Sequence, residues 1–174
     1  MTQTADWEQL KLQDLCARLD VDYDGARNTL ARGIRPRGVR QHPGRGNHRQ
    51  YDRTQAFHLA LILKLKAAGM TTTLAGKVAE WARVIQGMSV NLGWDHRFAP
   101  FSGNFQTERE WFVDVGDARF GRIATNAHPG KDTLYVTPWV ELKSRKSAEG
   151  ACPVVIFRVD IARLAHLLLE PVEC

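Results

Sequence analysis

Residues 25 to 51 constrain the fold of this chain more than any other stretch, because they carry charge of a single sign. The stretch contains seven arginines and no Asp, Glu or Lys. Charged side chains are rarely buried without a partner of opposite charge, so this stretch is expected on the surface. A local field of that sign attracts a polyanion such as nucleic acid. A solvated basic loop is the alternative interpretation.

The charge of the whole chain is unevenly distributed. Residues 1–88 hold 14 Lys and Arg against 8 Asp and Glu, whereas residues 89–174 hold 10 against 11. The basic character therefore belongs to the first half. The use of arginine rather than lysine between residues 25 and 51 favours recognition, since a guanidinium grips phosphate or a guanine edge with two parallel hydrogen bonds.

Two short helices are predicted ahead of the basic stretch. The apolar positions of the first recur at offsets of three, four and seven residues, which places them on one face: Leu12, Leu15, Cys16 and Leu19. Residues 20–23 interrupt the pattern as a tight turn. The second helix buries Ala26, Leu30 and Ala31 and presents Arg27, Asn28 and Arg32 on its other face. Gly33 is expected to cap its C-terminus.

Residues 34–51 are expected to form a β-hairpin, or wing, because they contain two prolines and three glycines between short extended pieces. A third helix follows, capped by Thr54 and ended by Gly69. Leu61 and Leu63 lie opposite its main apolar face, so this helix is expected to be covered on two sides.

A fourth helix is expected to begin near Thr72 or Thr73. Its apolar residues follow a 4-3-4-3 spacing, through Leu74, Val78, Trp81, Ile85 and Met88. Two heptads are too few for a coiled coil by themselves. Packing into the chain's own core and a dimer seam are equally good interpretations.

The second half is predicted to be a small β-rich unit. After a lead-in over residues 91–107, strands are expected at Trp111–Val115, Phe120–Thr125, Leu134–Val140 and Val154–Val159. Asp160 then caps a final helix. The predicted fold class is α+β, with a winged helix-turn-helix domain over residues 1–88 and an α+β domain over 89–174 for dimerisation or partner binding.

The first half resembles the DNA-binding domain of MerR-type regulators, a domain that excisionases share. That family's pattern of apolar-x-Glu-Leu-Ala, Gly-Val, Thr-Leu-Arg and Gly-Leu is matched here by four short segments: Leu12-x-Asp14-Leu15-Cys16, Asp20-Val21, Gly25-Ala26-Arg27 and Gly33-Ile34. The wing ending Arg-x-Tyr-Ser is matched by Arg49-x-Tyr51-Asp52. The resemblance covers residues 10 to about 80. Asp20 and Gly25 depart from the family's usual Gly and Thr, and the connector before Arg49 is longer.

In a helix-turn-helix, the second helix is expected to enter the major groove with its N-terminal end leading. The side chains placed against DNA are Tyr23, Arg27, Asn28 and Arg32. The resemblance implies a phosphate or base contact for Arg27, and a grip of His48 and Arg49 on the neighbouring backbone or minor groove. Four arginines are expected to add affinity without reading sequence: Arg35, Arg37, Arg40 and Arg45. Tyr51 either reaches a phosphate with its hydroxyl or packs its ring beneath the wing.

No motif of a phosphate-binding loop, hydrolase elbow, zinc protease or paired cysteines occurs, so neither an enzyme nor a cofactor or metal is expected. The weaker alternative to a non-enzymatic protein is a nuclease, whose acid/base or metal site would be formed by Asp95, His96, Glu108 and Glu110. Cys16 is expected to be a buried packing residue. Six aromatic residues either form core or line a ligand pocket: Trp94, Phe98, Phe101, Phe105, Trp111 and Trp139.

The sequence thus predicts a sequence-specific regulator of transcription that binds double-stranded DNA as a homodimer. Its second half is expected to offer a surface to a second copy or to a protein partner. The alternative is an excisionase-like factor that bends DNA in phage or mobile-element recombination. The run Leu59–Leu63 is too short for a membrane span, and no secretion signal opens the chain. We expect a protein of the bacterial cytoplasm or of a phage, associated with the nucleoid.

Overall fold

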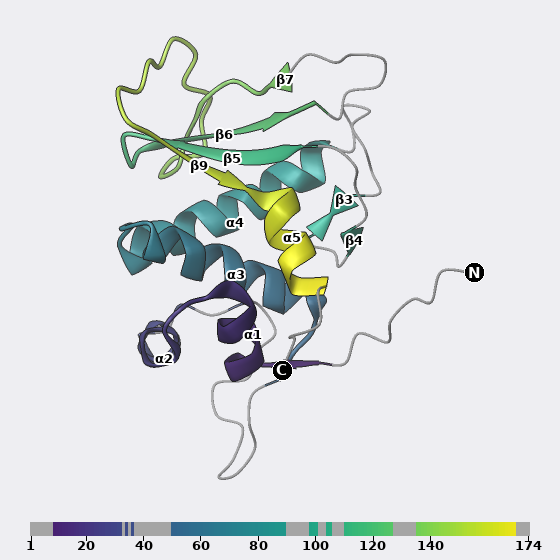
Figure 1. Ribbon diagram of the computed structural model, residues 1–174. Coiled ribbons are helices and arrows are strands. Elements are labelled where there is room, and N and C mark those ends of the chain that lie inside the picture. The colour runs from purple at the N-terminus through teal and green to yellow at the C-terminus, as the bar shows by residue number, and fades with distance from the viewer. Residues whose placement is uncertain are drawn as a thin grey trace, which may run out of the picture.

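The structure is a computed structural model that describes residues 9–32, 34, 36, 50–89, 98–100, 104–105, 110–126 and 135–169. Within these residues the chain is α+β, with five helices and a five-stranded antiparallel sheet. The sheet lies at one end of the molecule and the first two helices lie at the other, with α3 and α4 between them (Figure 1). No helix of the described part is long and apolar enough to cross a bilayer.

The predicted helix pair is present as α1 (Leu12–Leu19) and α2 (Tyr23–Ala31). Before it, the short strand β1 (Leu10–Lys11) pairs antiparallel with β2 (Gln50–Tyr51), with Leu10 opposite Tyr51. The chain therefore returns beside its own start after the basic stretch. The expected hairpin lies mostly outside the described residues, as does Gly33.

Helix α3 (Arg53–Ala67) is the central element of the core. Asp52, not Thr54, caps it: the Asp52 carboxylate accepts from the Gln55 backbone N–H at 2.8 Å, and the Gln55 side chain accepts from the Asp52 N–H at 3.2 Å. The Thr54 prediction is wrong because this reciprocal capping box satisfies two free N–H groups at once. Leu59, Leu61 and Leu63 are all buried, so the helix is covered on both sides as expected.

Helix α4 (Thr72–Ser89) begins at the predicted residue. Val78 and Trp81 of its apolar stripe are buried in this chain's own core. The side chains of Ile85 and Met88 lie outside the described residues. The described part of the stripe therefore packs within the chain.

The sheet has the strand order β7-β6-β5-β9, with β8 also paired to β6. Its strands are β5 (Trp111–Gly116), β6 (Phe120–Thr125), β7 (Tyr135–Val136), β8 (Val140–Glu141) and β9 (Ile156–Asp160). A separate pair joins β3 (Phe98–Ala99) to β4 (Asn104–Phe105). Gly121 lets α4 approach β6, because a Cβ there would lie 2.9 Å from Cζ3 of Trp81.

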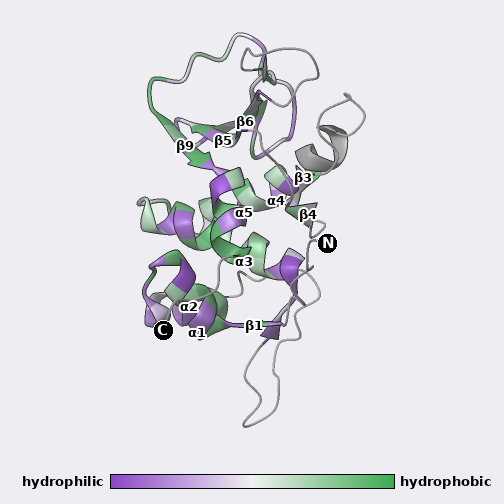
Figure 2. Cartoon of the chain, turned by 45° about the vertical axis from the view of Figure 1, so that its right-hand side comes forward, coloured by the Kyte–Doolittle hydropathy of each residue, from purple (hydrophilic) through white to green (hydrophobic). Residues whose placement is uncertain are grey.

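Helix α5 (Ile161–Leu169) joins the two predicted halves. The Asp160 carboxylate accepts from the Arg163 N–H at 2.8 Å, so the predicted cap is confirmed. α5 packs against α1, α3 and β5, and hydrophobic residues are concentrated along α3 and α5 (Figure 2). One continuous core runs from Leu15 to Leu168. The predicted boundary at residue 88 does not divide this core.

Candidate nucleic-acid interface

Helix α2 has one buried face and one exposed face, although Ala31, which was expected to be buried, is exposed. Ala26, Thr29 and Leu30 are buried against the rest of the chain. The remaining face carries the four predicted contact residues, all exposed: Tyr23, Arg27, Asn28 and Arg32. Tyr23 leaves 41% of its surface exposed, a large fraction for an aromatic residue. The polar face of α2 is therefore free to meet a ligand.

Lys66 of α3 fixes the position of α2. Its ammonium donates to the Gly25 carbonyl at 3.1 Å and to the Thr29 hydroxyl at 2.8 Å. The Thr29 hydroxyl in turn donates to the same carbonyl at 2.8 Å. Lys66 is not among the site residues predicted from the sequence, where its only signal is a lysine that interrupts the apolar pattern of α3. These bonds hold α2 at one angle to α3, which a recognition element requires.

The N-terminal end of α2 is acidic. Asp22 caps it by accepting from the Gly25 N–H at 2.5 Å, and Asp24 follows in the first turn. Both carboxylates are favoured there by the helix dipole. Asp24 also lies 3.4 Å from Nη1 of Arg27, in a pair whose side chains are 79% and 63% exposed. This ion pair is weak because water screens it, so Arg27 can exchange Asp24 for an anionic ligand.

The Arg27 guanidinium lies 5.8 Å from the centre of the Tyr23 ring. Such a contact between a cation and an aromatic face is modestly attractive at an exposed site. It favours a position of the arginine along the outer face of α2, beside Tyr23.

Tyr51 does not lie on this surface. Its side chain is fully buried, so its ring packs inside the fold and its hydroxyl does not reach a phosphate in this conformation. We remove Tyr51 from the set of DNA contacts. The other predicted contacts lie outside the described residues: Arg35, Arg37, Arg40, Arg45, His48 and Arg49.

The alternative nuclease site is only partly described. Glu110 is exposed and its carboxylate accepts from the Asn126 amide at 3.4 Å, whereas Asp95, His96 and Glu108 lie outside the described residues. Within the described part, no three His, Cys, Asp or Glu side chains are grouped as metal ligands. Of the six aromatic residues interpreted as core or pocket lining, Phe105, Trp111 and Trp139 are buried in the core. Trp94, Phe101 and the side chain of Phe98 lie outside the described residues.

Cys16 is buried on α1, as expected of a packing residue. Burial, with a smaller contribution from the negative charge of Asp22, raises the pKa of the Cys16 thiol to about 11. The thiol is therefore protonated at neutral pH and a poor nucleophile.

Comparison of the chain with family models, curated proteins and solved structures gives no significant match. The resemblance to MerR-type domains therefore rests on the residues quoted for it. Any function assigned to the chain has to come from the surface of α2 and the charge around it.

Proposed function

We propose that this protein is a sequence-specific regulator of transcription that binds double-stranded DNA through α2 and the basic residues that follow it. One observation carries the proposal: a rigidly anchored helix presents Tyr23, Arg27, Asn28 and Arg32 to solvent. That face opens a 27-residue stretch, 25 to 51, which has seven arginines and no acid. Shape and charge therefore favour the same polyanionic ligand.

In this proposal the outer face of α2 enters the major groove. Arg27 is suited to the two acceptors of a guanine and Asn28 to the edge of an adenine. Arg32 and the arginines beyond it bind phosphates, which fix the position of the helix on the duplex without reading sequence. The Asp24 carboxylate then either accepts a hydrogen bond from a cytosine amino group or repels the phosphate backbone of the DNA. In either case the N-terminal turn of α2 discriminates between DNA sequences.

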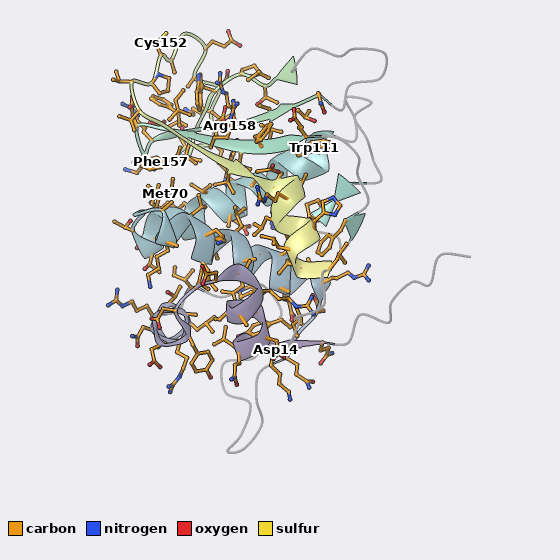
Figure 3. All side chains as sticks on the ribbon, viewed as in Figure 1. Asp14, Met70, Trp111, Cys152, Phe157 and Arg158 are labelled. Atoms are coloured by element: carbon orange, nitrogen blue, oxygen red, sulfur yellow. The ribbon has the colours of Figure 1, made fainter. Side chains whose placement is uncertain are left out.

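The proposal includes a second copy of the chain. A helix of two and a half turns makes few base contacts, and paired half-sites about 34 Å apart compensate for this. The apolar run ahead of and into β9 is exposed: Val154 by 91%, Val155 by 53%, Ile156 by 46% and Phe157 by 39%. β9 is a terminal strand of the described sheet, and Phe157 and Arg158 lie along it (Figure 3). An antiparallel pairing of two such strands is self-complementary and gives a twofold dimer.

Arg27→Ala tests the role of α2. Binding sites are first selected from random duplex DNA with the wild-type protein, and affinity is then measured by gel shift. We expect the variant to lose roughly 1–3 kcal/mol on the selected site while its thermal stability is unchanged, because Arg27 is exposed.

Arg163→Ala is the matched control, since Arg163 is an exposed arginine on α5 at a distance from α2 in the chain. Equal affinity of Arg27→Ala and the control would exclude Arg27 from the interface. A selected site made of tandem direct repeats, with strong bending of the DNA, would favour the excisionase-like alternative over the regulator.

A further inference from the structure

A pocket of about 440 Å³ lies between α3, α4, Ile34 just beyond α2, and the turn after β8. α3 contributes His58 and Ile62, α4 contributes Thr73, Gly76, Lys77 and Glu80, and the turn contributes Leu142, Lys143 and Arg145. Ile34 closes the side nearest to α2. The volume is within the range of pockets that bind small organic molecules.

The floor of the pocket is formed mainly by apolar side chains, together with the buried His58. Ile62 is fully buried and Leu142 nearly so, and both lie in the hydrophobic core. Ile34 packs on Gly76 so closely that a Cβ on Gly76 would lie 3.3 Å from its Cγ2. A ligand body that fits this floor is therefore hydrophobic.

Three cations surround this floor: Lys77, Lys143 and Arg145. All three are exposed, and none forms an ion pair with another described residue. Glu80 is the one carboxylate among the described lining residues, and it already binds Arg83 at 2.8 Å. Among the described residues, the three lining cations therefore outnumber the one lining carboxylate, and Glu141 is close enough to Lys143 to act on it electrostatically.

The backbone of Arg145 is held in place by the turn after β8. Its φ of 59° is in the left-handed region, where glycine or asparagine is easier to accommodate. The turn holds it there, because the Arg145 N–H donates to the Glu141 carbonyl at 2.7 Å. Arg145 is therefore fixed through its backbone at the edge of the pocket.

We propose that this pocket binds a small organic anion with a hydrophobic body, such as an aromatic or branched aliphatic carboxylate. The body lies on Ile34, Ile62 and Leu142, and the carboxylate meets Lys77, Lys143 and Arg145. The three cations break no ion pair with a described residue when they bind the anion, so charge gives selectivity and the floor gives affinity.

The pocket also touches the element that leads out of α2. Ile34 follows Arg32, the residue that caps the C-terminus of α2, by two positions, and it is the wall that a ligand would meet. Resting on the proposed function, the ligand therefore changes DNA affinity by changing the packing of Ile34 on Gly76. The binding of DNA changes ligand affinity by the same factor.

The test uses anilinonaphthalene sulfonate, a fluorescent anion with an aromatic body, as the probe on the full-length protein. The variant replaces Lys77, Lys143 and Arg145 with Gln, and the control replaces the exposed Lys11, Lys146 and Arg163 with Gln, so both lose three positive charges. We expect the pocket variant to bind the probe at least about tenfold more weakly, and the control to bind it like the wild type. Naphthoate should displace the probe, and neutral naphthamide should not.

Equal weakening in the two variants, displacement by naphthamide, or no binding of the probe to the wild type would each overturn the proposal. A further titration measures DNA affinity with and without saturating naphthoate. If the pocket variant and the control bind the probe equally well, the proposed anion site is overturned even if the protein binds DNA. Failure of the wild type to bind DNA overturns the proposed function, while the fluorescence result still decides the pocket.

Discussion

Asp20 has a left-handed backbone conformation, with φ 49° and ψ 57°, in the turn between α1 and α2. Its N–H donates to the Ala17 carbonyl at 3.2 Å, and the Val21 N–H donates to the Cys16 carbonyl at 3.1 Å, which ends α1. Glycine is the usual residue in such a cap because it has no Cβ to clash. This geometry explains why Asp20 stands where the resembling family has Gly, since Asp tolerates the conformation better than most residues.

Replacing Asp20 tests the strain in this turn. We expect Asp20→Ala to lower the free energy of unfolding by roughly 1 kcal/mol, and Asp20→Gly to be at least as stable as the wild type. Urea unfolding measures both, with Gln13→Ala on the exposed side of α1 as a control. If Asp20→Ala were as stable as Asp20→Gly, the left-handed turn would not be a source of strain.

At the scale of elements, the sheet is held by a charge cluster on the strands rather than by apolar contacts alone. Asp114 of β5 is fully buried and binds Arg122 of β6 at 2.9 Å and Arg158 of β9 at 2.7 Å. The two guanidiniums lie over aromatic rings, Arg122 at 4.2 Å from Trp139 and Arg158 at 4.9 Å from Phe112. One carboxylate therefore joins three neighbouring strands.

The stability of the sheet should depend on pH through Asp114. Burial by itself raises the pKa of Asp114, but hydrogen bonds and charge from Arg158 and Arg122 outweigh it and leave the pKa below its ordinary value of 3.8. A carboxyl whose pKa is lower in the folded state contributes its full stabilisation above its ordinary pKa, and this contribution is lost as the pH falls from that value through the lower pKa of the folded state.

Unfolding in urea between pH 7 and pH 3 measures this contribution. We expect Asp114→Asn to be less stable than the wild type at pH 7, because two arginines lose their partner, and to lose less further stability on acidification. Parallel pH profiles for the two proteins would show that Asp114 does not contribute to the acid sensitivity.

The arginines of the predicted wing can be tested for phosphate binding through the salt dependence of DNA affinity. If Arg45 and Arg49 bind phosphates, the slope of log K against log salt should become shallower by up to about 2 when both are replaced by Ala. Replacing Lys146 and Arg163 by Ala removes the same charge elsewhere and should leave the slope unchanged. A slope near zero for the wild-type protein would exclude binding dominated by phosphates.

At the scale of the whole molecule, the exposed run before and within β9 is the proposed contact between two copies. Val155→Glu with Ile156→Glu places charge on residues that are 53% and 46% exposed, so the fold should tolerate it. We expect the wild type to be a dimer by light scattering and this variant to be a monomer with weaker DNA binding, because the linkage of half-sites is lost. Leu169→Glu, at a 40% exposed residue on α5, is the control. A dimeric variant would place the interface elsewhere.

The sequence allowed prediction where the pattern is local. The spacing of Leu12, Leu15 and Leu19 predicted α1, and Asp160 predicted the start of α5, because helix periodicity and caps depend on residues a few positions apart. The anchoring of α2 by Lys66 and the burial of Tyr51 depend on partners far away in the chain, which no local pattern specifies. For the same reason the division into two halves did not anticipate one shared core.

The position of α5 has a consequence for synthesis on the ribosome. The Arg18 guanidinium of α1 donates to the Leu168 carbonyl near the end of α5, and α5 also covers part of α3. The surface proposed to read DNA is therefore supported by a helix that leaves the exit tunnel long after α1 and α3. A nascent chain that has not reached residue 161 leaves apolar side chains of α1 and α3 in water, where chaperones and proteases recognise them. Competence to bind DNA would thus begin only when translation has passed α5, so that incomplete products are removed before they can occupy a site.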